Sequence, residues 1–361
     1  MPVHLVGDAS SHEFFVRAKC ASNGELHESA APSIHIGLIN NMPDAALKAT
    51  ERQFLTLVDS AANGMAIHVS LYAMPGVPRS EGATRHLHRF YSGIENLWDR
   101  RLDGLIVTGA EPRAQNLKDE PYWESLTKVI DWAGHNTHST VWSCLAAHAA
   151  LLHIDGIGRR RLANKRFGVF ECARASDHQL TAGVGSPLRM PHSRWNDILE
   201  SELTHCGYNV LTRSHDGSVD AFAKQRKSLF VFFQGHPEYE ANTLLLEYRR
   251  DVRRYLRGER DTYPPMPEGY LDRDTADLFA AMRDRSPSDR SPELRVDLPA
   301  ALAEKRVSNT WHSASARLYG NWLAYLQAQN QCQAKEKPRG AHPRRAMTAL
   351  LRAQASEARP A

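Results

Sequence analysis

The sequence has few cysteines, and they are widely dispersed. The five thiols lie at positions 20, 144, 172, 206 and 332 of a 361-residue chain, and no two of them form a CxxC pair. Secreted domains stabilised by disulfides usually have an even number of cysteines. Zinc sites built from cysteines need closely spaced pairs of them. The pattern therefore predicts no metal site, and it is typical of a reduced, cytoplasmic protein.

Long apolar runs and a large excess of one charge are also missing. No stretch approaches the roughly 18 apolar residues of a membrane-spanning helix. The N-terminal segment MPVHLVGDASSHEFF has no basic region followed by an apolar one, as a secretory leader would. The formal net charge is only +4, and a basic excess is concentrated in the last 29 residues. We therefore expect a protein that binds neither membranes nor nucleic acids.

Hydrophobic periodicity divides the chain into three parts. Residues 1–32 are polar and aperiodic, and we interpret them as a poorly ordered N-terminal extension. Residues 33–330 carry the pattern of one enzyme domain, with a polar insertion at about 258–310. Residues 331–361 form a basic tail that we expect to be flexible.

Within the central part, apolar strands alternate with helices. Strands are predicted at 34–39, 67–71, 105–107, 139–143 and 228–233. Helices are predicted from residue 44, at 122–133, 144–152, 241–256 and 318–327, with shorter helical patterns at 276–282 and 347–351. This alternation predicts an α/β fold, with a parallel sheet covered by helices on both faces.

Cys144 lies where the predicted strand TVWS meets the predicted helix LAAHAALL. Such a strand–turn–helix elbow presents a nucleophile at the carboxyl edge of a parallel sheet. The partial positive charge of the helix N-terminus favours a thiolate, and the backbone N–H of Leu145 is available to hold an oxyanion. On position alone, a small buried cysteine without chemistry is an equally good interpretation.

His236 and Glu238 follow the apolar strand SLFVFF, whose carboxyl end should reach the same sheet edge. Residues two apart in an extended segment project to one side, and Pro237 stiffens the backbone between them. A carboxylate beside an imidazole sets its tautomer, as a general base requires. The alternative is an exposed histidine in a surface turn. His148, one helical turn beyond Cys144, lies away from this edge.

Seven segments in chain order resemble the homoserine O-acyltransferase family of MetA type. They are IGLINNMPDAALKATERQFL, RLDGLIVTGAEP, STVWSCLAAHAAL, NKRFGVFE, MPHSRWND, FFQGHPEYEANTLLLEYRRDV and WHSASARLYGNWLAYL, between about residues 34 and 327. The resemblance implies a flavodoxin-like sheet similar to that of class I glutamine amidotransferases, with helices on both faces and C-terminal helical additions.

The resemblance also implies a ping-pong acyl transfer in methionine biosynthesis. Cys144 matches the acylated nucleophile, His236 the general base and Glu238 its orienting carboxylate. The N–H groups of Leu145 and of the turn after Thr108 would hold the oxyanion. The implied partners are small-molecule substrates, namely acyl-CoA as co-substrate and homoserine. No other cofactor is expected, and a homodimer is left open.

Four further residues match substrate-site positions of the family. Lys165 and Ser193 match a substrate-site lysine and serine, and Arg250 matches the arginine that grips the amino-acid carboxylate. Glu247 lies one helical turn before Arg250 on the same face. The alternatives are a surface i,i+3 pair for Glu247 and Arg250, and a solvated basic face for Lys165 in the run RRRLANKR.

The loop after TGA departs from the family pattern, which usually has a proline directly after these three residues. Here the run is TGAEPR, so that Glu111 replaces the proline and Arg113 takes the donor-discriminating position. A guanidinium there would pair with the distal carboxylate of succinyl-CoA, which favours that donor. Acetyl-CoA is favoured instead if Arg113 points to solvent and Glu111 occupies the pocket, and serine remains an alternative acceptor.

Two other classes of protein share this fold. A glutaminase-type amidotransferase uses a similar cysteine, histidine and glutamate, but it has glycines two positions before and after the nucleophile. Trp142 and Ala146 stand at those positions here. A non-catalytic regulator would tolerate loss of Cys144, His236 or Glu238, and all three are present.

Overall fold

The structure is a computed structural model that describes residues 3–5, 33–110, 112–285 and 307–336. Its centre is a sheet of eleven strands in which one half is parallel and the other antiparallel. None of the helices within these ranges is long and apolar enough to cross a membrane.

The parallel half contains all five of the predicted strands. In sheet order it runs β1 (Val3–Leu5), β3 (Ile67–Ala73), β2 (Ile34–Ile39), β5 (Gly104–Val107), β6 (Ser139–Ser143) and β11 (Leu229–Phe233), with β4 (Ser92–Gly93) beside β3. Counted along the chain from β2, the five predicted strands follow the order 2-1-3-4-5, which is the flavodoxin-like order. The predicted fold class is therefore confirmed for this half of the sheet.

The antiparallel half was not predicted. It adds β10 (Val219–Gln225), β9 (Asn209–Ser214), β7 (Arg160–Arg174) and β8 (Leu188–Asp197), each antiparallel to its neighbour. These four strands extend the predicted parallel sheet on one side. These strands carry many charged residues and do not alternate regularly between buried and exposed positions, as the pattern of β7 shows. The period-2 signal of a half-buried strand is therefore weak.

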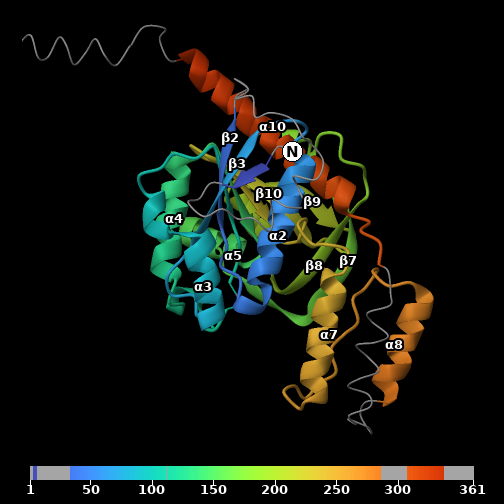
Figure 1. Cartoon of the computed structure of the whole chain (residues 1–361). Helices are drawn as coiled ribbons and strands as arrows, with labels where there is room; N and C mark the ends of the chain where they lie inside the picture. The colour runs from blue at the N-terminus through green and yellow to red at the C-terminus, as the bar shows by residue number, and fades with distance from the viewer. Residues whose placement is uncertain (1–2, 6–32, 111, 286–306, 337–361) are drawn as a thin grey trace, which may run out of the picture.

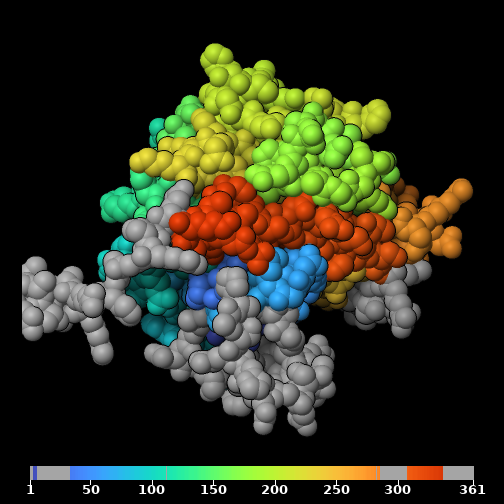
Figure 2. All heavy atoms as spheres, turned by 90° about the horizontal axis from the view of Figure 1, so that it is seen from above, coloured from blue at the N-terminus to red at the C-terminus, as the bar shows by residue number. Residues whose placement is uncertain are grey.

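Helices cover both faces of the sheet, as predicted (Figure 1). On one face α2 (Asp44–Ala61) and α10 (His312–Glu336) pack over an apolar core. On the other face α4 (Trp123–Asn136) and α5 (Leu145–Asp155) pack over a second core. Figure 2 shows α10 lying across the surface between α2 and the segment around η3 (Gln179–Thr181), in agreement with its contacts to both.

The remaining helices are α3 (Glu81–Phe90), α6 (Glu200–His205), α7 (Thr243–Leu256) and α8 (Arg273–Arg285). A third apolar cluster joins α7 and α8 to β7 and Trp311. The predicted helical patch at 276–282 therefore lies within α8, inside the polar insertion. Backbone bonds from Glu268 N–H to Phe167 O (2.9 Å) and from Val169 N–H to Glu268 O (2.8 Å) attach this insertion to β7.

Both ends of the predicted domain contain more secondary structure than the sequence indicated. Within the expected N-terminal extension, β1 pairs in parallel with β3, while residues 6–32 lie outside the described residues. At the other end, α10 continues to Glu336, beyond the expected boundary at residue 330. The helical pattern predicted at 347–351 also lies outside the described residues.

Candidate active site

Cys144 stands between β6 and α5 in a backbone conformation that is rare for residues other than glycine. Its φ is 51° and its ψ is −111°. Its N–H donates to the carbonyl of Phe233 at 2.7 Å, which ties this turn to the end of β11. A strained turn from strand to helix places a nucleophile at the sheet edge, and the Cys144 side chain is half-buried there.

The structure brings His236 and Glu238 together beside Cys144. His236 Nδ1 lies 2.8 Å from Glu238 Oε1, and both residues are buried. Since Glu238 engages Nδ1, Nε2 is the nitrogen left for the contact with the Cys144 sulfur. Burial lowers the pKa of His236, but the Glu238 carboxylate and the Cys144 thiolate outweigh burial and raise this pKa well above its ordinary value. This arrangement favours the protonated imidazolium form of His236.

His148, the other histidine near the nucleophile, lies within α5 and is buried. Burial and the nearby guanidiniums of Arg194 and Arg159 lower its pKa to about 3. A group with so low a pKa is a weak base at neutral pH. His236 is therefore the better general base of the two.

Tyr239, which was not predicted from the sequence, joins the His236–Glu238 pair to the polar group around Glu247. Its ring stacks on the His236 ring with centroids 4.3 Å apart and an interplanar angle of 16°. Its hydroxyl donates to Glu247 Oε1 at 2.6 Å. Trp311 Nε1 donates to the Tyr239 carbonyl at 2.8 Å, which fixes the backbone of the tyrosine. Its place directly after Glu238 in the motif was the available signal.

Two of the four predicted substrate-site residues, Ser193 and Lys165, contact a third one, Glu247. Ser193 donates from Oγ to Glu247 Oε2 at 2.5 Å, and Lys165 Nζ lies 3.4 Å from the same oxygen. Lys165 Nζ also lies 4.1 Å from the ring centroid of Phe167, so that the ammonium is packed rather than solvated. The solvated-face alternative for Lys165 is therefore wrong, since only 9% of its side chain is exposed.

Arg250 lies on α7, three residues beyond Glu247, at the outer side of this group. Its Nη2 is 3.0 Å from Asp251 Oδ1, and 55% of its side chain is exposed. The structure thus pairs Arg250 with Asp251, whereas the surface-pair alternative joined it to Glu247.

The turn after β5 lies against the N-terminus of α5. A Cβ added to Gly109 would lie 2.6 Å from Leu145 Cβ and 2.9 Å from Leu145 N, so the two backbones are in close contact. Asn41 holds this turn, because its N–H donates to Thr108 Oγ1 at 2.8 Å and its Nδ2 donates to Thr108 O at 3.0 Å. The contact between the two backbones places the turn after β5 directly beside the first residue of α5.

The loop expected to choose the acyl donor is anchored by a buried carboxylate that was not predicted. Glu120 Oε1 accepts the N–H groups of Arg113 and Ala114 at 2.6 and 2.7 Å, and Glu120 is 4% exposed. The Arg113 side chain is exposed, and Glu111 lies outside the described residues.

Comparison with known proteins agrees with the resemblance of the motifs. A family model described as homoserine O-succinyltransferase matches residues 13–333. A homoserine O-succinyltransferase of Rhodopseudomonas palustris is 46% identical over 298 residues, covering 82% of this chain and 90% of that protein. Another from Bradyrhizobium japonicum is 46% identical over 310 residues, covering 86% and 95%.

Among solved structures, a glutamine amido transferase from Methylobacillus Flagellatus is similar with a TM-score of 0.47 and 16% identity, covering 87% of this chain and 98% of that one. This likeness is weak, so the fold assignment rests on the strand order. The family assignment rests on the family model and the curated relatives, both of which extend over most of the chain. On that evidence the chain belongs to the homoserine O-succinyltransferase family.

Proposed function

We propose that this protein transfers an acyl group from an acyl-CoA, with succinyl-CoA as favoured donor, to the hydroxyl of L-homoserine in methionine biosynthesis. The observation that carries the proposal is the contact of Cys144 with His236, whose other nitrogen is held by Glu238 at the sheet edge. We infer a cytoplasmic location from the dispersed cysteines, because thiols stay reduced in the cytoplasm. Acyl-CoA serves as a co-substrate, and no further cofactor is invoked.

In the first half-reaction the Cys144 thiolate attacks the thioester carbonyl carbon of acyl-CoA. The oxyanion is held by the N–H of Leu145 and by the turn after Thr108. The bond to the CoA sulfur then breaks, His236 supplies the proton that the departing thiolate takes up, and an acyl-cysteine remains. One thioester replaces another, so the step is close to balanced in energy.

In the second half-reaction His236 acts as the base. Acylation removes the thiolate charge at Cys144, which is one of the two charges that raise the pKa of His236. Loss of that charge lowers the pKa of His236, which favours the neutral imidazole. The neutral ring then accepts the homoserine hydroxyl proton as the oxygen attacks the acyl carbonyl. The Cys144 thiolate leaves, and the ester is released.

The acceptor is assigned to the group around Glu247. The ammonium group of the substrate would bind the Glu247 carboxylate beside Lys165, whose Nζ lies 3.4 Å from Oε2. This carboxylate also accepts bonds from Tyr239 and Ser193, and its two oxygens have lone pairs for a further donor. The guanidinium of Arg250 would bind the substrate carboxylate if it turned from Asp251. Serine presents the same two charged groups with a chain one methylene shorter, so it is the alternative acceptor.

The donor preference is assigned to the loop that carries Glu111 and Arg113. The Arg113 side chain is exposed in the structure, so it would have to turn toward the acyl group to pair with the distal carboxylate of succinyl-CoA. A desolvated pair of this kind, worth ~2–3 kcal/mol, would favour succinyl over acetyl transfer by roughly 30- to 150-fold. Turnover with succinyl-CoA and acetyl-CoA should be measured for wild type, Arg113→Ala and the matched control Lys118→Ala, which removes an exposed cation further along the same segment. Preference for acetyl-CoA by wild type, or a succinyl preference that survives Arg113→Ala, would contradict this assignment.

The proposal as a whole is tested by intact mass spectrometry. Mixing the protein with succinyl-CoA in the absence of homoserine should add the mass of one succinyl group, and adding homoserine should remove it. The rival glutaminase would instead release glutamate from glutamine. Absence of any acyl adduct with either CoA donor would rule out the acyl-cysteine route.

A further inference from the structure

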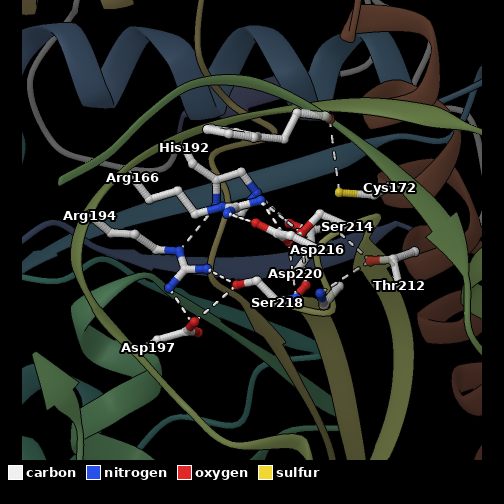
Figure 3. Close-up of polar contacts among 12 residues, drawn as sticks. Arg166, Cys172, His192, Arg194, Asp197, Thr212, Ser214, Asp216, Ser218 and Asp220 are labelled. Atoms are coloured by element: carbon white, nitrogen blue, oxygen red, sulfur yellow. Dashed lines mark hydrogen bonds and ion pairs between the residues drawn. The ribbon is translucent and has the colours of Figure 1, made fainter. Parts of the chain in front are cut away.

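The antiparallel half of the sheet contains a second buried polar cluster. Cys172 on β7, His192 on β8 and Asp220 on β10 are at most 1% exposed. Their sulfur, ring nitrogen and carboxylate oxygen lie within 4.8 Å of one another. Figure 3 shows these side chains pointing toward a common point between the strands, surrounded by Arg166, Arg194 and hydroxyl groups.

Polar contacts connect Arg194, His192, Asp220 and Thr212 in a chain. Arg194 Nε donates to His192 Nδ1 at 3.2 Å, His192 Nε2 lies 3.3 Å from Asp220 Oδ1, and Thr212 Oγ1 donates to Asp220 Oδ2 at 2.7 Å (Figure 3). The contact between His192 and Asp220 is close enough for an ion pair, but it is not aligned as a regular hydrogen bond. It therefore constrains the two strands by close packing of two buried polar side chains rather than by a strong directional bond.

The proton on His192 argues against a metal site. Because Nδ1 accepts from Arg194, a neutral ring carries its proton on Nε2, the nitrogen that faces Asp220. A metal ligand needs a free lone pair on that nitrogen. Burial, and then the Arg194 and Arg166 guanidiniums, lower the pKa of His192 to about 4 against the opposing effect of Asp220, so the ring is neutral at physiological pH.

This cluster lies directly against the residue that precedes His236. A Cβ added to Gly235 would lie 2.6 Å from Asp220 Oδ1 and 3.2 Å from His192 Cε1. The flanking backbone is held by the same two strands. Gln234 N–H donates to Asp220 O at 2.7 Å, and His236 N–H donates to Pro191 O at 2.8 Å.

We propose that His192 and Asp220 are positioning residues, which brace β8 against β10 beneath Gly235 and thereby hold His236 in line with Cys144. Neither residue needs to touch substrate for this role. The inference rests on the part assigned to His236 in the proposed function.

The first test compares three aspartate variants of the full chain. Asp220→Ala should lower kcat by about 10²-fold, the effect of a displacement near 1 Å, while the KM for acyl-CoA changes by less than about threefold. Asp220→Asn keeps the shape and the Oδ1 acceptor, so it should recover most of the rate. Asp216→Asn is the matched control, because Asp216 belongs to the same network but pairs with Arg166 and is 56% exposed.

A second readout separates positioning from simple loss of stability. The rate at which iodoacetamide alkylates Cys144, followed by peptide mapping across pH, depends on its contact with His236. Asp220→Ala should shift this profile toward that of His236→Asn, whereas a purely stabilising role would lower the melting temperature and leave the profile unchanged. If Asp220→Ala does not fold, His192→Asn replaces it, since the asparagine oxygen can still accept from Arg194 while the Nε2 contact is lost.

Wild-type kcat together with a wild-type alkylation profile in a folded Asp220→Ala or His192→Asn protein would overturn the proposal. A stoichiometric metal in the purified protein that is lost in Cys172→Ala would also overturn it, since the cluster would then be a metal site. If wild type fails to acylate homoserine but Asp220→Ala still shifts the alkylation profile, the proposed function fails while the brace stands.

Discussion

Gly109→Ala tests whether the turn after β5 supplies part of the oxyanion hole. The added Cβ would lie 2.6 Å from Leu145 Cβ and 2.9 Å from Leu145 N. Bringing the carbon contact to an ordinary 3.4 Å requires a separation of about 0.8 Å between the turn and the start of α5. Overpacking of this kind costs about 1–3 kcal/mol of stability.

The effect on catalysis should be larger than the effect on folding. A shift of this size moves one N–H donor relative to the other, and loss of a single oxyanion donor costs about 10²–10³-fold in kcat. We therefore expect kcat for succinyl transfer to fall by about 10²-fold, since the donor is displaced rather than removed.

The assay follows both half-reactions. Quenched mixing with succinyl-CoA and intact mass spectrometry gives the acylation rate, and loss of thioester absorbance in the presence of homoserine gives turnover. Gly134→Ala in α4 is the matched control, because its added Cβ meets only the Phe230 ring at 3.9 Å. That variant should keep its activity and gain up to about 1 kcal/mol of helix stability. A folded Gly109→Ala protein that acylates at the wild-type rate would refute the role given to this turn.

Three further substitutions test the assigned residues. Cys144→Ala should abolish the acyl adduct seen by mass spectrometry, while Cys206→Ala, another partly exposed thiol, should leave it in place; an adduct on the Cys144→Ala protein would end the mechanism. His236→Asn should lower kcat by about 10²–10⁴-fold or more, and Glu238→Gln should lower it less because it orients the imidazole, so the reverse order in steady-state rates would show that these roles are exchanged. Arg250→Lys should raise the KM of homoserine far more than that of acyl-CoA, because lysine keeps the charge but loses the fork that matches a carboxylate; equal changes in both constants would identify Arg250 as structural.

The parallel core and the elbow were predictable because their signals are local. Apolar runs marked β2, β6 and β11 to within one residue of their bounds. Cys144 follows β6 directly. The proximity of His236 and Glu238 was predicted from an extended segment, but the structure has a turn there, with Tyr239 N–H donating to His236 O at 3.1 Å, and the two side chains meet across that turn. These inferences need only the end of a strand and the rule that parallel strands end at a common edge.

The antiparallel half, and the contacts that depend on it, required the tertiary structure. Ser193 and Glu247 are 54 residues apart, and His192 and Asp220 meet only through the pairing of β7, β8, β9 and β10. A one-residue slip in any of these pairings would turn the side chains to the opposite face, so the local pattern does not determine the contacts. Arg250 shows the same limit, because its place on α7 follows from sequence, whereas its pairing with Asp251 and its exposure depend on how that helix is packed.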